Sequence, residues 1–500
     1  MGKNIRNLQI TSVIVILITV LVKLLGLIRE MKIAEVLGAT KESDAYNVAY
    51  LLVITIFGLF SSAYVNSLMP VSAKLYKDDR TKLGKTMGGM LSITISIMLV
   101  LIFTVYLFPS FYVKLLAGGL TGEALSLASE LVKISTWSLV ALVIISAFTV
   151  LLRLYDRNIY TTATELIFPI PILVAAFTGF HSPEILISCL VLGYALRALL
   201  LWAGSIFVHA HISLNFKWNN PYIKDMFCLM PPMLVSSGLL QINTLVDNQV
   251  ASLFSTGSIT ALQQAAKVNS LAYTVFSTSL LQIAFAKMSK AHVSGNKDEF
   301  NEIIQSQVKT ILLFIIPCAI VLPFFSTEII QILFLRGNYS VNASLIAGKI
   351  LLGYSLGLII FVLRDIFVYI FYSLQDSKTP TSINMFAIGI NIVLCFTLSH
   401  FVGIAGIAYA TSLSALISLI LLSLMLKRKI KGLNLISKSE ICKFVFAAFV
   451  DIALVLFLKK ITASFDNLFI YFVIFGAVFL AFWLVYYILD FILCLLRRAA

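Results

Sequence analysis

Charged residues are scarce in this chain. Of its 500 residues, 12% are Asp, Glu, Lys or Arg and 60% are hydrophobic, above the roughly 45–50% that is usual in soluble domains. Runs such as ITSVIVILITVLV (10–22) and MLSITISIMLVLIFTVYLF (90–108) are apolar on every side and leave no face for water. This composition excludes an ordinary soluble globular protein and predicts an all-α polytopic membrane protein.

Signatures of ATP binding and of zinc-protease catalysis are also missing. The chain contains no P-loop and no HExxH. His209 and His211 have no nearby set of cysteine or carboxylate ligands, and we expect them in a solvated loop. The six cysteines stand singly without CxxC spacing, which indicates no disulfide, zinc or redox site. We therefore expect no enzyme, no metal and no cofactor, and any transport energy would come from an ion gradient or the membrane potential.

Acidic residues are fewer than basic ones, 23 Asp and Glu against 37 Lys and Arg, so the formal net charge is +14. Most Lys and Arg residues fall in alternate short loops between the apolar runs. That distribution is typical of cytoplasmic loops and excludes a basic face for nucleic acid. It predicts a multi-pass protein of the cytoplasmic membrane with both termini in the cytoplasm.

Polar breaks and breaks with Pro or Gly divide the chain into about fourteen segments, each long enough to cross a bilayer. They lie near residues 8–29, 44–70, 87–109, 127–152, 163–180, 184–208, 227–253, 260–285, 309–333, 344–371, 382–400, 403–426, 441–459 and 468–494.

Three fragments recur at an offset of about 215 to 220 residues. LRLYDRNIYTT resembles FYSLQDSKTPT and pairs Asp156 with Asp376, and the first loop resembles a later one and pairs Glu30 with Asp247. LGYALRALL likewise resembles IAYATSLSALI. The offset spans an even number of segments and therefore predicts a parallel repeat about an axis along the membrane normal. The predicted domains are two six-helix lobes and two additional helices: 1–215, 216–430 and 431–500.

Several ionisable residues fall inside the predicted spans, where they are costly unless they have a partner or face a wet cavity. Lys23 and Glu30 are seven residues apart and share one helix face, while Arg29 points elsewhere. Arg29 and Glu30 fit a cavity, and they equally fit the outer interface with side chains that reach the headgroups. The other members of this set are Arg197, Asp247, Lys267, Arg364 and Asp365.

Lys267 follows Gln263 and Gln264 and precedes Asn269, so its helix begins with a polar, cationic face. If the two lobes pack around a cleft, Lys23 and Lys267 converge on it and favour an anionic cargo. Arg197 and the pair Arg364–Asp365 equally fit ion pairs that hold helices together.

Four stretches resemble the MurJ (MviN) lipid II flippases of the multidrug/oligosaccharidyl-lipid/polysaccharide exporter superfamily. The first is LGLIREMKIAEVLGATKESDAYNVAY (25–50), which is similar to the opening signature of that family. The others are KMSKAHVSGNKDEFNEII (287–304), ILFLRGNYS (332–340) and FYSLQDSKTPT (371–381). The resemblance runs nearly end to end.

This resemblance implies two lobes around a cationic cavity, with the last two helices forming a groove for a lipid tail. It implies that an undecaprenyl-diphosphate-linked peptidoglycan precursor, lipid II, moves from the inner to the outer leaflet by alternating access. The family's cavity residues carry over onto Lys23, Arg29, Asp44 and Lys267. The charges inside the predicted spans add Glu30, Asp247, Arg364 and Asp365 as supporting residues. The implied location is the bacterial cytoplasmic membrane, and the implied partners are the lipid-linked saccharide, membrane lipids and the cell-wall synthesis machinery.

The chain departs from the family pattern in ways that bear on cargo. Phe57 and Gly58 stand where members have a basic pair, and Ser270 stands where an acidic residue is expected. Lys23 and Lys267 replace arginines and so lack the two-pronged guanidinium that suits phosphate. One alternative is therefore a flippase for another lipid-linked oligosaccharide of capsule, teichuronic or O-antigen type. Alternatives of other classes are a cation-coupled drug antiporter, which would need acidic ion sites, and a non-transport scaffold.

Overall fold

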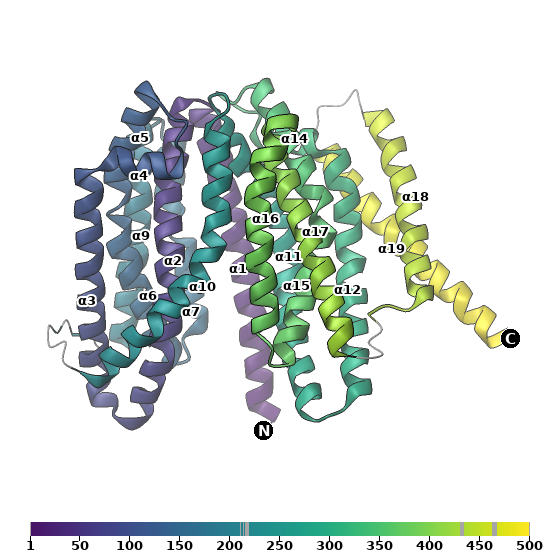
Figure 1. Ribbon diagram of the computed structural model, residues 1–500, viewed down its shortest axis with the longest axis horizontal. Coiled ribbons are helices and arrows are strands. Elements are labelled where there is room, and N and C mark those ends of the chain that lie inside the picture. The colour runs from purple at the N-terminus through teal and green to yellow at the C-terminus, as the bar shows by residue number, and fades with distance from the viewer. Residues whose placement is uncertain are drawn as a thin grey trace. The chain divides into compact units, whose positions relative to one another are not determined.

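The computed structural model describes residues 2–210, 212–213, 215, 220–430, 435–462 and 468–499. These residues form nineteen α-helices and one short 3-10 helix, and no strand occurs among them (Figure 1). Within the described residues, ten helical stretches are long and apolar enough to cross a membrane, or eleven if one bent pair is counted as a single span. The predicted all-α membrane class is confirmed, and the total of fourteen spans stays a prediction.

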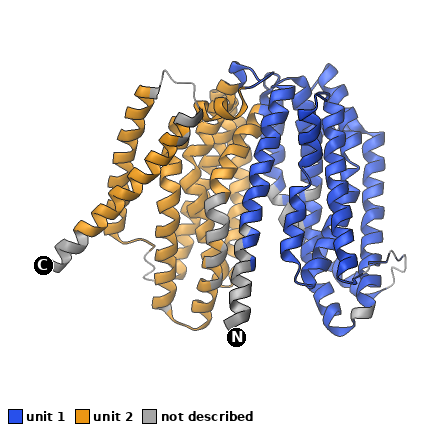
Figure 2. Ribbon diagram, turned by 180° about the vertical axis from the view of Figure 1, so that it is seen from behind, with its two compact units in different colours: residues 1–260, 336–343 blue, residues 261–335, 344–500 orange. Residues whose placement is uncertain are grey.

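Contacts divide the chain into two compact units, coloured separately in Figure 2. Unit 1 comprises residues 1–260 and 336–343, and unit 2 comprises residues 261–335 and 344–500. The predicted lobes at 1–215 and 216–430 and the additional helices at 431–500 rest on the sequence repeat and stay a prediction.

The helices of unit 1 are α1 (Gly2–Leu37), α2 (Lys41–Asp78), α3 (Arg80–Leu107), α4 (Pro109–Leu116), α5 (Gly122–Ser135), α6 (Ser138–Leu154), α7 (Asn158–Ala163), η1 (Thr164–Leu166), α8 (Ile170–Phe177), α9 (Pro183–Phe207) and α10 (Pro221–Ser252). Helix α11 (Ser258–Val293) begins in unit 1 and continues in unit 2. The other helices of unit 2 are α12 (Lys297–Phe324), α13 (Ser326–Phe334), α14 (Val341–Leu356), α15 (Leu358–Ser373), α16 (Lys378–Val402), α17 (Ala405–Lys429), α18 (Lys438–Thr462) and α19 (Leu468–Ala499), and the first turn of α14 is assigned to unit 1.

Every predicted segment coincides with helix, but four of them are interrupted, among them 163–180, where a turn at residues 167–169 separates η1 from α8. The expected span 309–333 ends as α12 at Phe324, and α13 continues separately. Pro317 and Pro323 lie inside α12, where each lacks the N–H that would extend the helical hydrogen bonds. The expected span 344–371 bends by 41° at Gly357, where an added Cβ would lie 2.4 Å from the Ser412 hydroxyl oxygen. The expected span 127–152 is divided into α5 and α6.

The turn that ends α6 recurs at the end of α15. Each turn contains one residue in the left-handed region, Asp156 with φ 58° and Gln375 with φ 60°. Both are closed by a 3.0 Å hydrogen bond from a backbone N–H to the carbonyl five residues earlier: Arg157 to Leu152 and Asp376 to Phe371. The same kind of turn, with a residue in the left-handed region and a hydrogen bond to the carbonyl five residues earlier, also ends α8 at Gly179 and α9 at His209. The turn is therefore a common helix ending in this chain, and the pairing of Asp156 with Asp376 stays a prediction.

Asp376 closes the second turn by its side chain as well. Its carboxylate accepts hydrogen bonds from the Thr379 N–H at 3.0 Å and hydroxyl at 2.7 Å, and pairs with the Lys429 ammonium at 2.6 Å. These donors, the Lys429 ammonium first, lower the pKa of Asp376 to about 2. The loop before α16 is thereby tied to the end of α17.

The first turn of α11 is capped by a side chain from α2. Asp44 is buried and accepts hydrogen bonds from the Gly257 N–H at 2.6 Å, the Thr260 N–H at 2.9 Å and the Thr260 hydroxyl at 2.8 Å. The Asn47 amide also donates to the Thr260 hydroxyl oxygen at 2.9 Å. A carboxylate at this position satisfies N–H groups that lack helical partners. Its negative charge also interacts favourably with the positive end of the helix dipole.

The end of α1 is capped from a distant part of the chain. Gly38 ends the helix in the left-handed region, with φ 66°, as is common after a helix C-terminus. Asn338 donates from its backbone N–H to the Glu35 carbonyl at 2.9 Å and from its side chain to the Val36 carbonyl at 2.6 Å. The stretch ILFLRGNYS therefore contributes a cap to α1, because helical carbonyls at a C-terminus have no partners within the helix.

Replacing the Asp44 cap should destabilise the protein without touching any other feature of α2. Asp44→Ala removes three hydrogen bonds to one carboxylate, and we expect a loss of about 2 kcal/mol in unfolding free energy. Thermal unfolding in detergent measures this loss. Glu42→Ala is the matched control, since Glu42 is an exposed acid in the same turn. Equal unfolding temperatures for the two variants would show that the cap adds nothing.

Candidate functional site

Lys23 is the most accessible of the predicted cations. It lies on α1, its side chain is exposed, and it forms no ion pair or hydrogen bond with any residue that the structure describes. An ammonium on an apolar helix with no carboxylate beside it is available to an anion. Lys23 therefore has the properties expected of a cargo-binding cation.

Arg29, in contrast, is buried and already neutralised. Its side chain is 7% exposed and its Nη2 forms an ion pair with Glu30, which is 9% exposed. The same nitrogen donates to the Tyr50 hydroxyl at 3.2 Å. The alternative in which Arg29 reaches out to the headgroups is wrong, because the guanidinium is held inside unit 1.

Two aromatic rings complete the surroundings of Arg29. Its guanidinium carbon lies 5.2 Å from the centre of the Tyr50 ring on α2 and 5.0 Å from that of Phe168, just before α8. Phe168 in turn stacks on Tyr194 of α9 at 4.2 Å. Arginine is suited to such a box because its planar cation stacks on aromatic faces. The Nε atom of Arg29 is buried and makes no hydrogen bond with the described residues.

Arg197 behaves as the ion-pair interpretation predicted. Its Nη2 lies 2.8 Å from Glu165 Oε1, which joins α9 to η1. The other expected interhelical pair is different: Arg364 and Asp365 are neighbours on α15, with the Arg364 Nε and Nη2 atoms 3.0 and 2.9 Å from one oxygen of Asp365. The link between helices at that point is the Tyr273 hydroxyl of α11, which donates to the other oxygen.

The remaining predicted residues are divided between the units. Asp44 caps α11 in unit 1, with its carboxylate oxygens bonded to Gly257 and Thr260. Asp247 lies on α10 of unit 1 and is partly buried. Lys267 lies on α11 of unit 2, half-buried, and follows Thr260 by seven residues in the same helix. Unit 1 thus holds Lys23, Arg29, Glu30, Asp44 and Asp247, and unit 2 holds Lys267, Arg364 and Asp365.

The two departures from the family pattern have structural counterparts. An added Cβ at Gly58 would lie 2.6 Å from Nε2 of Gln241, so the glycine makes room for a neutral amide from α10. Ser270 donates its hydroxyl to the Lys267 carbonyl at 2.8 Å. Unit 1 therefore carries an amide beside the position where the family has a basic pair, and Ser270 supplies no charge to neutralise Lys267.

The GxSxG spacing of serine hydrolases occurs here as Gly353-Tyr354-Ser355-Leu356-Gly357. Ser355 is 1% exposed and lies within α14, where its hydroxyl donates to the Leu352 carbonyl at 2.9 Å. A nucleophile of that class stands exposed on a sharp turn between a strand and a helix. This serine is therefore a helix residue and not a nucleophile.

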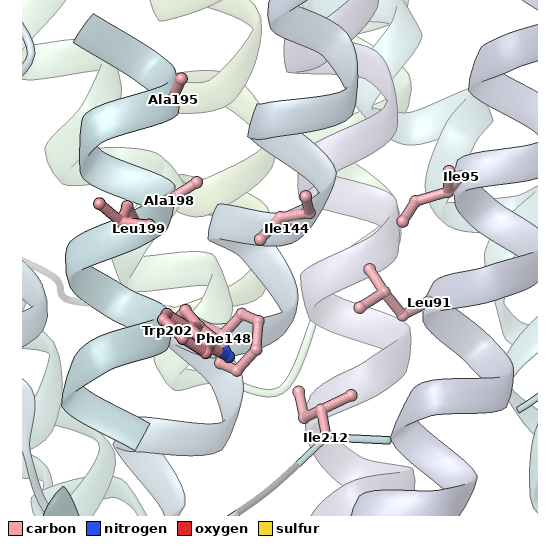
Figure 3. Close-up of a pocket in the computed structure, with 9 residues that line it drawn as sticks. All are labelled: Leu91, Ile95, Ile144, Phe148, Ala195, Ala198, Leu199, Trp202 and Ile212. Carbon is pink, nitrogen blue, oxygen red and sulfur yellow. The ribbon is translucent and has the colours of Figure 1, made fainter. Parts of the chain in front are cut away.

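An apolar cavity of about 410 Å³ lies in unit 1 between α3, α6 and α9. Figure 3 shows the side chains that surround it, among them Phe148 and Trp202. The indole nitrogen of Trp202 is the one polar atom among the lining side chains, which also include Leu91, Ile95, Ile144, Ala195, Ala198, Leu199 and Ile212. Such a lining suits hydrocarbon and offers nothing to a diphosphate.

The aromatic and hydroxyl partners of the predicted charges had no signal in the sequence. Tyr50 and Phe168 around Arg29 and Tyr273 at Asp365 are ordinary residues of apolar segments. Glu165, near Pro169, could have been found as the one carboxylate of its segment. Their roles depend on contacts across up to 139 residues of chain, as for Arg29 and Phe168.

Comparison with known proteins gives one consistent result. The family model described as "Lipid II flippase MurJ" matches residues 33–480. The probable lipid II flippase MurJ of Vibrio cholerae is 26% identical over 435 residues, which cover 83% of this chain and 82% of that protein. The lipid II flippase MurJ of Burkholderia cenocepacia is 25% identical over 431 residues, with 82% of each chain covered.

Solved structures share the fold. A lipid II flippase MurJ in an inward closed conformation has a TM-score of 0.81 at 24% identity and covers 96% of this chain and 98% of its own. An inward-facing multidrug resistance transporter of the MATE family, in the MOP superfamily, has a TM-score of 0.72 at 14% identity and covers 82% of this chain. Since the family model spans most of the chain, this protein belongs to the lipid II flippase MurJ family.

Proposed function

We propose that this protein moves lipid II from the inner to the outer leaflet of the bacterial cytoplasmic membrane. The observation that carries the proposal is the match of the MurJ family model over residues 33–480. Cargo of this kind has a diphosphate between a polar saccharide and a hydrocarbon tail, and it needs a cationic site within membrane helices. Lys23 supports such a site, because it is exposed on α1 and has no partner among the described residues.

The cations would act in different ways. Lys23 is available at once, whereas Arg29 reaches an anion only if its ion pair with Glu30 is loosened. A diphosphate that takes the place of Glu30 would keep the guanidinium paired, which avoids the cost of an unpaired buried charge. Lys267 is the predicted third contact, and Asp44 would position the helix that carries Lys267 by capping its first turn.

Alternating access needs an energy source outside the chain. With a negative cytoplasm, each negative charge that crosses the full field outward gains about 2.3 kcal/mol per 100 mV. The empty cationic site is drawn back inward by the same field. Both effects favour net export of an anionic lipid. The protein would therefore need no cofactor, and its termini would lie in the cytoplasm, near the enzymes of cell-wall synthesis.

A second candidate is a flippase for another undecaprenyl-linked saccharide. The neutral Gln241 amide against Gly58 favours it, since that position lacks the basic pair of the family. A multidrug resistance transporter of the MATE family shares the fold at a TM-score of 0.72, but the positive charge of Lys23 argues against the alternative of a cation-coupled drug antiporter, because it would repel a cationic drug.

Rescue of a MurJ-depleted bacterium tests the function directly. We expect the unmutated chain to restore growth and Lys23→Ala to lower flipping about tenfold, the loss of roughly one charge-assisted contact. Lys41→Ala is the matched control, because Lys41 pairs with Glu123 at an exposed position. Failure of the unmutated, well-expressed chain to rescue, together with activity on another lipid-linked saccharide, would assign the cargo to the second candidate.

The pair Arg29–Glu30 allows packing and cargo binding to be separated. Arg29→Met should lower the unfolding free energy by about 3–5 kcal/mol, because it removes the ion-pair partner of the buried Glu30 carboxylate. The double variant Arg29→Met/Glu30→Leu should recover that stability in a thermal unfolding assay. Flipping should stay lost in the double variant if Arg29 binds the diphosphate. Full flipping by the stable double variant would make Arg29 a packing residue only.

Collapse of the membrane potential should slow flipping. In proteoliposomes with purified lipid II, a potassium gradient with valinomycin sets the potential, and added external potassium abolishes it. We expect faster flipping at 100 mV than at zero, since each transferred charge gains about 2.3 kcal/mol. Equal rates at both potentials would contradict electrical coupling while leaving the cargo assignment intact.

A further inference from the structure

Helix α18 carries a carboxyl group in an unusual setting. Asp451 lies near the middle of α18, a helix that is apolar and long enough to cross the membrane. The residue is 0% exposed. Neither of its carboxylate oxygens has a hydrogen-bond partner among the residues that the structure describes. Buried polar groups in folded proteins nearly always have a partner, so this carboxyl group needs an explanation.

Contacts at both ends of α18 show which residues of α12 lie beside Asp451. At one end, Lys309 Nζ of α12 lies 3.5 Å from Glu440 Oε1. At the other end, Lys459 Nζ donates to the carbonyl of Phe324, which is the last residue of α12. The two helices therefore run side by side in the same direction (Figure 1). With equal rise per residue, Asp451 is level with residues 316–320 of α12.

Helix α19 also packs against α12 and α18 at the level of Asp451. Pro317 has no N–H, which leaves the Leu313 carbonyl without its helical partner, and Trp483 Nε1 of α19 donates to that carbonyl at 3.0 Å. Farther along, the rings of Tyr471 and Phe325 lie 6.0 Å apart. These contacts place residues 476–480 of α19 level with 316–320 of α12. The middle of that stretch, Val478, is fully buried.

The described residues of α12 and α19 at the level of Asp451 therefore carry no charge. Residues 316–320 read IPCAI and residues 476–480 read GAVFL, with the Cys318 thiol as the one ionisable group. The charged and titratable groups on these helices gather at the two ends of the packed region. At one end they are Lys309, Glu440, Lys443, Tyr486 and Asp490, with Lys438, Cys442 and Tyr487 beside them; at the other they are Lys459 and Lys460 of α18 and Tyr471 of α19, with Glu328 of α13 as the partner of Lys459.

The nearest charges on α18 itself, Lys443 and Lys459, are each eight residues from Asp451, or about 12 Å along the helix. Both are already paired, Lys443 with Glu440 and Asp490, and Lys459 with Glu328. Burying an ionised carboxylate in such a place costs several kcal/mol, whereas the neutral acid costs far less.

We propose that Asp451 is a binding site for one proton, occupied while α18 is packed against α12 and α19. The carboxylate takes a proton from hydronium and releases water, and it gives the proton back when α18 moves far enough for water to reach it. Proton occupancy thereby holds α18 in place. This inference concerns neither the cargo nor the cationic site, and it stands whether or not lipid II is the substrate.

Infrared spectroscopy of the full chain in lipid nanodiscs tests the proton directly. At neutral pH we expect a carbonyl band of a protonated carboxylic acid that is lost in Asp451→Asn and shifted in frequency in Asp451→Glu. Asp490→Asn is the matched control: Asp490 is also on this helix pair but forms an ion pair with Lys443, and the band should survive its replacement. A spectrum that is the same in the wild type and in a folded Asp451→Asn variant would overturn the proposal.

Hydrogen–deuterium exchange tests the link to helix packing. Asp451→Asn cannot lose a proton, so its α18 amides should exchange as slowly as those of the wild type at neutral pH. At alkaline pH the wild type should exchange faster than Asp451→Asn in α18, with both proteins measured at the same pH. Equal exchange of the two proteins at alkaline pH would show that the proton does not hold α18.

Discussion

An apolar membrane interior cannot hydrate a charge, and the side-chain pairing in both units follows from that constraint. Arg29 is paired with Glu30 and enclosed by two rings, Arg197 is paired with Glu165, and Asp365 has a bond on each oxygen. Each arrangement lets a long cationic or acidic side chain lie among apolar helices without the full cost of burial.

The same constraint applies to the backbone at helix ends. Asp44 satisfies the first N–H groups of α11, and Asn338 satisfies the last carbonyls of α1. Trp483 satisfies the carbonyl that Pro317 leaves open inside α12. In each case the partner comes from a distant part of the sequence, so the caps also tie segments together within a unit. These polar side chains lie in apolar segments because each one satisfies a backbone group that has no partner within its own helix.

Lys23 and Asp451 are two ionisable side chains with no ion pair or hydrogen bond to a described residue, and they differ in their accessibility. Lys23 is exposed, so its charge is available to an anion that brings its own countercharge. Asp451 is fully enclosed, so the small ligand that neutralises it there is a proton. One group suits a large anionic lipid and the other a proton because their accessibility differs. In a flippase, an exposed cation and an enclosed acid on different helices can serve binding and conformational control separately.

The sequence by itself determined the helices, because apolar runs in a membrane must satisfy their own backbone hydrogen bonds. All fourteen predicted segments coincide with helix, and four motifs were enough to recognise the MurJ family, which the comparisons show. The tertiary structure decided which charges are paired, since Arg29 with Phe168 and Asp365 with Tyr273 meet only through packing. Periodicity along a chain reports the face of a helix, whereas a partner on another helix depends on how the helices pack.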